Sequence, residues 1–460
     1  MLSRLNKVLI CAAVLLIACP AQSQEKDGGG NWPNWRGPAG DGVAAENANP
    51  PLEWSDTKNV KWKIEVPGKG ISTPIVWGNQ IIVTSAVPTG KPDDKKAAEP
   101  KEEPPPKGEG PGGKGKGKGR RMSGPPPSTP YEFVVISYDR ETGKQNWSTK
   151  VNEAVPHEGV HGTNTFASAS PVTDGNHIFA SFGSNGIYCL DMKGKEIWKK
   201  DLGKMKTRAS FGEGASPALH GDTLVVPWDH EAGSFIVALD AKSGTEKWRK
   251  DRDEPSSWST PLITEYKGVT QVITNGTKRA RSYDLKDGSL IWECGGQSQN
   301  PIPTPIRDGD YVLVMTGYSG FSIQSIALDS KGDVTDSDKV RWSKTDAAPY
   351  VPTGVLYKGN VYFTKSRDPR FSILRAENGE TLVDQESLPG LDGLYASLVA
   401  ANDHIFALGR NGSAVVLKHG NKLNIVGKNK IDEGIDASPI VLGNQLFIRG
   451  HKHLFCFEKK

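Results

Sequence analysis

Residues 216–248 read SPALHGDTLVVPWDHEAGSFIVALDAKSGTEKW and contain every signal of one repeating unit. The stretch opens with a hydroxyl residue and proline, runs through three short apolar segments, and ends on a segment that carries Trp248. Asp240 and Gly244 precede that tryptophan, and an Asp-x-x-x-Gly hairpin has a clear mechanism. Asp accepts backbone N–H bonds in the turn, and Gly adopts the positive φ that the turn requires. The stretch therefore predicts four short antiparallel strands.

The same unit recurs along most of the chain. Its hairpin is repeated at Asp139/Gly143/Trp147, Asp191/Gly194/Trp198 and Asp284/Gly288/Trp292, and in an expanded form between Asp329 and Trp342. Its opening is repeated at Ser72-Thr73-Pro74, Ser170-Pro171, Thr260-Pro261, Thr304-Pro305, Thr353-Gly354, Ser397-Leu398 and Ser438-Pro439. From Pro171 onward these marks fall 46, 44, 44, 49, 44 and 41 residues apart. This period is typical of a four-stranded propeller blade.

The two ends of the chain indicate how the ring closes. The last unit, which begins at Ser438, has room for only three strands, while residues 60–66 form a strand with no blade before it. Pairing this strand with the last unit would remove a free sheet edge. We therefore predict an all-β fold over residues 60–460, an eight-bladed β-propeller whose last blade is closed by the N-terminal strand. We expect the recurring tryptophans to pack between blades; they are Trp62, Trp147, Trp198, Trp248, Trp292 and Trp342.

The first 23 residues have the pattern of a secretory signal peptide. A basic start is followed by an apolar run over residues 8–17 and small residues at positions 21 and 23. Leu16-Ile-Ala-Cys19 also resembles a lipobox, so a lipid anchor at Cys19 is an alternative to a released product. We expect export to the periplasm or cell envelope, with residues 24–59 extended, no transmembrane span and a monomeric chain.

Charge is concentrated in one insertion. Residues 88–130 are rich in Pro, Gly and Lys and carry ten basic against six acidic residues, whereas the propeller body is close to neutral. We predict a disordered loop within the first blade, with binding of a polyanion as the alternative to a solvated insertion. The near-neutral body lacks the basic surface that nucleic acid requires.

The cysteines and histidines do not assemble a recognisable reactive centre. Beyond the leader the chain has Cys189, Cys294 and Cys456, which we expect to be buried free thiols. The pairs His157/His161 and His451/His453 lack further ligands at metal-binding spacing. We therefore predict no catalytic residue and no bound metal ion.

The repeat resembles the pyrroloquinoline quinone (PQQ) repeat of bacterial β-propellers. The opening Asn31-Trp-Pro-Asn-Trp-Arg-Gly-Pro38 and the segments 161–164, 253–261 and 350–352 resemble exported members of this family. Quinoprotein dehydrogenases of this fold typically have a Cys-Cys pair, and some have a Cys-x-x-Cys-His haem motif; this chain has neither. The resemblance extends to the lipoprotein of the outer-membrane β-barrel assembly machinery, which is a binding scaffold.

A candidate site follows from the predicted topology. Residues just before each Ser/Thr-Pro mark should converge at one mouth of the central channel, where polar and aromatic side chains suit a ligand pocket. The predicted ligand-binding residues are His161, Asn164, Arg208, Glu213, Trp258, Asn300, Tyr350, Tyr395 and Asp436.

Two functions remain open at this level. The first is an exported, non-catalytic scaffold that binds a protein or polymer of the cell envelope without a cofactor. The alternative is a quinoprotein oxidoreductase that uses PQQ and Ca²⁺ to oxidise an alcohol or sugar, with Trp258 against the quinone.

Overall fold

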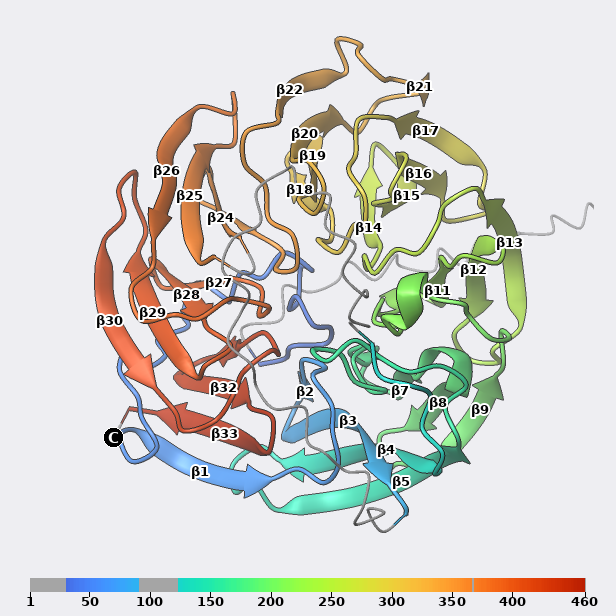
Figure 1. Cartoon of the computed structure of the whole chain (residues 1–460), viewed down its shortest axis with the longest axis vertical. Helices are drawn as coiled ribbons and strands as arrows, with labels where there is room; N and C mark the ends of the chain where they lie inside the picture. Colours follow the sequence, from blue (N-terminus) through green and yellow to red (C-terminus); the bar gives the residue numbers. More distant parts are fainter. Residues whose placement is uncertain (1–29, 91–122, 366–367, 460) are drawn as a thin grey trace, which may run out of the picture.

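Eight antiparallel sheets stand around a central channel in the computed structural model (Figure 1). The structure describes residues 30–90, 123–365 and 368–459. The predicted all-β, eight-bladed propeller is confirmed. The proposed signal peptide, Cys19 and most of the basic insertion lie outside the described residues.

The first four blades follow the predicted order of strands from the channel outward. Blade 1 consists of β2 (Ile75–Trp77), β3 (Gln80–Pro88), β4 (Tyr131–Asp139) and β5 (Gln145–Ala154), and blade 2 of β6 (Val172–Thr173), β7 (His177–Ser181), β8 (Ile187–Asp191) and β9 (Glu196–Lys200). Blade 3 consists of β10 (Ala218–His220), β11 (Thr223–Trp228), β12 (Ser234–Asp240) and β13 (Glu246–Arg252), and blade 4 of β14 (Leu262–Tyr266), β15 (Val269–Thr274), β16 (Ala280–Asp284) and β17 (Leu290–Cys294). Two short 3₁₀ turns, η1 (Gly183–Asn185) and η2 (Arg208–Ser210), lie in the connecting loops.

The second half of the ring repeats this order with one addition. Blade 5 consists of β18 (Ile306–Asp308), β19 (Tyr311–Thr316), β20 (Ser322–Ala327) and β22 (Val340–Lys344), and blade 6 of β23 (Val355–Tyr357), β24 (Asn360–Thr364), β25 (Arg370–Arg375) and β26 (Thr381–Ser387). Blade 7 consists of β27 (Val399–Ala401), β28 (His404–Leu408), β29 (Ser413–Lys418) and β30 (Ile425–Lys430), and blade 8 of β31 (Ile440–Leu442), β32 (Gln445–Arg449), β33 (His453–Glu458) and β1 (Val60–Glu65). The expanded hairpin of blade 5 contributes β21 (Gly332–Asp333), which pairs with the outer strand of blade 4.

The two ends of the propeller meet in blade 8. Strand β1 pairs antiparallel with β33, with Ile64 opposite Leu454, and Figure 1 shows these strands side by side. The outer strand of the last blade is thus supplied by the N-terminal part of the chain, as the sequence predicted.

A belt of hydroxyl residues explains the repeated Ser/Thr mark. The backbone N–H of Ser170 donates to Oγ of Ser216 at 2.9 Å, and the N–H of Ser216 donates to Oγ1 of Thr260 at 3.1 Å. The pattern passes from blade to blade, and the eighth link is a bond from Oγ1 of Thr304 to the carbonyl of Thr260. The belt residues are Thr73, Ser170, Ser216, Thr260, Thr304, Thr353, Ser397 and Ser438. Because buried N–H groups need acceptors, seven of the eight belt positions require a hydroxyl that accepts, while Thr304 instead donates.

The recurring tryptophans lie against hairpins of the following blade. Trp248 Nε1 donates to the Leu285 carbonyl at 2.8 Å, and its ring covers Gly288. Trp62, Trp147, Trp198 and Trp342 make the same bond to a carbonyl of the next blade, while buried Trp292 donates to Gln271 within its own blade.

Because the indole of Trp248 lies close to Gly288, adding a single methyl group at this glycine should lower the stability of the fold. Gly288 and Gly268 both have positive φ, but a Cβ at Gly288 would lie 2.6 Å from the Trp248 ring, whereas at Gly268 it would meet nothing within 4 Å. Gly268→Ala is expected to cost about 1–2 kcal/mol of stability, the cost of a left-handed alanine. Gly288→Ala is expected to cost about 1–3 kcal/mol more because it displaces the indole. Urea denaturation measures both, and equal losses would contradict the packing role of Trp248.

The segment before β1 crosses the end of the channel opposite the predicted mouth. Trp32 forms a bridge with Val76 of blade 1, and the Arg36 guanidinium donates to the carbonyls of Leu398 and Gly354 at 2.8 and 2.7 Å. Burial lowers the pKa of Arg36 to about 10. The segment therefore joins the inner strands of blades 1, 6 and 7 and forms a floor beneath the channel.

Candidate functional site

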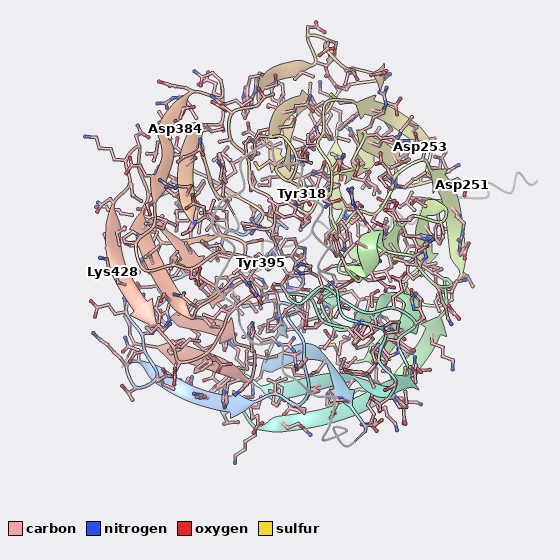
Figure 2. All side chains as sticks on the ribbon, viewed as in Figure 1. Asp251, Asp253, Tyr318, Asp384, Tyr395 and Lys428 are labelled. Carbon is pink, nitrogen blue, oxygen red and sulfur yellow. The ribbon has the colours of Figure 1, made fainter. Side chains whose placement is uncertain are left out.

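A cavity of about 220 Å³ lies in the central channel between the floor and the predicted mouth. Six belt residues surround it: Thr73, Ser170, Ser216, Thr260, Ser397 and Ser438. Loops that connect one blade to the next form its upper wall. Figure 2 shows Tyr318 and Tyr395 near the middle of the ring, with Asp384 and Lys428 on its periphery.

Six of the nine predicted ligand-binding residues line this cavity. They are His161, Asn164, Trp258, Tyr350, Tyr395 and Asp436. Glu213 lies instead in a smaller side pocket of about 50 Å³ between blades 2 and 3. Arg208 and Asn300 contact one another, with a distance of 3.2 Å from Nη1 to Oδ1, and neither lines the central cavity.

Further aromatic residues complete the wall. Trp35 rises from the floor segment, Phe211 packs edge-on against His161 at 5.2 Å between ring centroids, and Tyr318 lies 5.0 Å from Tyr350. None of these three residues was predicted from the sequence as part of the site. Trp35 stands in a motif that had been noted without a role, whereas Phe211 and Tyr318 lie farther from the Ser/Thr marks than the residues considered.

Among the described residues that line the cavity, Asp436 is the one carboxylate, and hydrogen bonds occupy both of its oxygens. Asp436 accepts a hydrogen bond from Arg410 Nε at 2.7 Å and lies 3.0 Å from His451 Nε2. Burial alone would raise the pKa of Asp436, but the hydrogen bonds from His451 and Arg410 outweigh it and lower the pKa. Arg410 also stacks on Tyr395, with its guanidinium carbon 4.4 Å from the ring centroid. The Asp436 charge is therefore balanced behind the wall, and this group is poorly suited to act as a base.

The carboxylate of Glu213 differs from that of Asp436 because its pKa is raised and not lowered. Its carboxylate accepts hydrogen bonds from the backbone N–H and the hydroxyl of Ser184, and it occupies space that any side chain at Gly183 would need. Burial raises its pKa despite the Ser184 bonds. Since the folded state holds this proton more tightly than the unfolded state, ionisation of Glu213 weakens the fold as pH rises through its folded-state pKa.

Glu213→Gln is accordingly expected to raise stability at pH 7 by about 1 kcal/mol, near the low end for a desolvated polar group. Glutamine keeps an oxygen for Ser184 and has no charge. The advantage over the wild type should disappear as pH falls toward 4, where Glu213 is protonated in both states. Thermal unfolding between pH 4 and 8 tests this, with exposed Glu196→Gln as the control; a variant less stable at every pH would contradict it.

The histidine pairs each have local hydrogen-bond partners. His157 Nε2 lies 2.6 Å from the Met205 carbonyl, and His453 Nδ1 lies 2.8 Å from Glu433. Within the described ranges, no group of three or more His, Cys, Asp or Glu side chains is placed to hold a metal ion. Cys189, Cys294 and Cys456 are buried and free, as predicted. In the same ranges we find no helix with the length and apolarity of a membrane span.

Comparisons with known proteins place the chain in a family. A family model described as outer membrane protein assembly factor BamB matches residues 132–385, and the chain belongs to this PQQ-like propeller family. Among solved structures, BamB from Moraxella catarrhalis is 16% identical, with a TM-score of 0.51, over 71% of this chain and 89% of that one. A search of curated proteins found no match.

Two enzymes share the same fold. Quinohemoprotein alcohol dehydrogenase from Comamonas testosteroni is 10% identical, with a TM-score of 0.57, over 94% of this chain and 81% of that one. The enzyme ADHIIG from Pseudomonas putida is 9% identical, with a TM-score of 0.54, over 93% and 80%. At these identities the likeness extends to the fold alone.

The cavity does not fit PQQ and Ca²⁺. Ca²⁺ takes six to eight oxygen ligands, usually including several carboxylates, but Asp436 is the only carboxylate among the described lining residues, and it is already paired. PQQ carries three carboxylates, whereas the described residues that line the cavity include neither lysine nor arginine. The donor set is therefore wrong for both the metal ion and the quinone.

Proposed function

We propose that this protein is an exported, non-catalytic scaffold of the bacterial cell envelope, which holds part of a protein or polymer partner in its mouth cavity. The carrying observation is that Trp35 and several further aromatic residues line the cavity, and that the only carboxylate among its described lining residues, Asp436, is paired with Arg410 and hydrogen-bonded to His451. This arrangement offers contact area without a free acid, base or metal site. Membership of the BamB family supports the same function.

Oxidoreductase activity is the competing function, and only the fold likeness favours it. The test is a titration of purified protein with PQQ and Ca²⁺, followed by tryptophan fluorescence and by dye-linked oxidation of alcohols and sugars. We expect neither saturable binding nor turnover. Binding in the micromolar range with turnover would overturn the proposal.

The partner surface can be tested by photo-cross-linking in cells. Tyr318 is 43% exposed at the mouth, and replacing it with a benzophenone amino acid should cross-link a defined envelope component. The control is the same replacement at Lys428, which is exposed on the outer strand β30 (Figure 2). Cross-linking from Lys428 but not from Tyr318 would show that the outer edge of a blade, rather than the mouth, is the binding surface.

A further inference from the structure

The belt hydroxyls provide hydrogen-bond donors around the cavity. All six that line it accept a backbone N–H from a neighbouring blade, as Thr260 Oγ1 does from Ser216 at 3.1 Å. None of these six donates to another atom of the described residues. A hydroxyl has one proton and two acceptor sites, so accepting a bond leaves its proton available. The cavity is thus surrounded by a ring of O–H donors.

The rest of the lining is aromatic and almost without charge. Trp35 at the floor and Trp258, Phe211, Tyr350 and Tyr395 in the wall present ring faces and edges. The Asp436 carboxylate is paired with Arg410 and lies within hydrogen-bond distance of His451, and among the described residues no lysine or arginine lines the space. A charged ligand would lose its hydration without gaining a counter-charge. The occupant must therefore be uncharged, rich in oxygen and apolar on part of its surface.

We propose that the cavity binds a neutral sugar ring, either a free saccharide or the terminal unit of a glycan chain. This proposal rests on the proposed scaffold function and identifies the polymer partner as a glycan. Sugar hydroxyls accept from the belt protons, and the C–H face of a sugar lies against aromatic rings. An apolar peptide side chain would leave the six donors without partners, at a cost for each. A volume of about 220 Å³ is below the 300–1,000 Å³ of drug-sized pockets, which limits the occupant to one sugar unit.

Titration with defined sugars tests this proposal. The probes are glucose, galactose and N-acetylglucosamine, their linear oligosaccharides, and a Phe-containing tripeptide as the apolar alternative. Binding is followed by calorimetry and by the intrinsic tryptophan fluorescence, to which Trp35 and Trp258 in the cavity wall contribute. Saturable binding of a monosaccharide would identify a free sugar as the ligand, whereas much tighter binding of an oligosaccharide would identify a glycan end.

A matched pair of belt variants isolates the role of the hydroxyls. Thr260→Val and Thr353→Val each remove a hydroxyl that accepts a buried backbone N–H, from Ser216 and Thr304 respectively. Both should lower thermal stability by similar amounts. Thr260 lines the cavity and Thr353 does not, so only Thr260→Val should weaken sugar binding, by roughly 3- to 10-fold for one lost hydrogen bond.

Tyr318→Ala provides a second test if the belt variants fold poorly. Tyr318 is 43% exposed at the mouth, so removal of its ring spares the core and should still weaken the binding of an oligosaccharide. The proposal is overturned if no sugar binds saturably, if only the tripeptide binds, or if Thr353→Val weakens binding as much as Thr260→Val. A protein partner cross-linked from Tyr318 without any sugar binding would leave the scaffold function standing and refute the sugar ligand alone.

Discussion

Replacing Arg252 by methionine is expected to lower the free energy of unfolding by about 3–5 kcal/mol, the cost of leaving a buried charge without its partner. Arg252 Nε lies 2.7 Å from Asp229 Oδ1, and the two side chains are only 1% and 2% exposed. Nη1 of Arg252 also donates to Thr274 and Tyr283 in blade 4. The variant would leave the buried Asp229 carboxylate without its ion-pair partner and would remove the hydrogen bonds from Arg252 to blade 4.

Urea denaturation of three variants separates the contributions. Arg370→Met removes one member of the Asp368 pair, whose side chains are 45% and 60% exposed, and should cost less than 1 kcal/mol. The double variant with Asp229→Leu and Arg252→Met should recover much of the loss, because no buried charge remains. If Arg252→Met cost no more than Arg370→Met, the buried pair would have no structural role.

The repeat could be predicted from the sequence because one physical requirement recurs in every blade. Seven of the eight belt hydroxyls accept the N–H of a neighbouring blade, and most outer strands place a tryptophan over a hairpin glycine, as in Trp248 and Gly288. These local requirements produce sequence motifs that recur at a regular spacing. The blade count followed from the same marks together with the strand at residues 60–66 that had no blade of its own.

Site residues could be predicted only where they stand at a fixed position relative to the repeated Ser/Thr mark. Loops before each mark converge on the channel, so Trp258 and Asp436 line the cavity, whereas Asn300 does not. Asn300 has a positive φ of 54° and a buried side chain that accepts from Arg208 outside the cavity. Trp35 reaches the cavity from a segment outside the repeat. No spacing rule connects such a segment to the channel.

Removing residues 30–66 is expected to have the largest effect of any change considered. The deletion leaves β33 as an unpaired edge and takes Trp32, Trp54 and Trp62 from the largest core cluster. A large-to-small change at a single buried tryptophan costs about 3–5 kcal/mol, so losing three exceeds the 5–15 kcal/mol by which domains are usually stable. The shortened chain should therefore fail to fold and should aggregate through the exposed edge.

A circular permutant distinguishes strand pairing from chain order. Residues 30–66 would follow residue 460 through a flexible linker, and the new chain would begin at residue 67. Because β1 runs antiparallel to β33, with Val60 opposite Phe457, a linker that also lets residues 30–59 reach the floor restores both contacts. The permutant should unfold within a few degrees of the wild type, whereas the same permutant with Trp54→Ala and Trp62→Ala should remain strongly destabilised. If the shortened chain alone matched the wild type in thermal unfolding, closure of blade 8 would not be what holds the ring together.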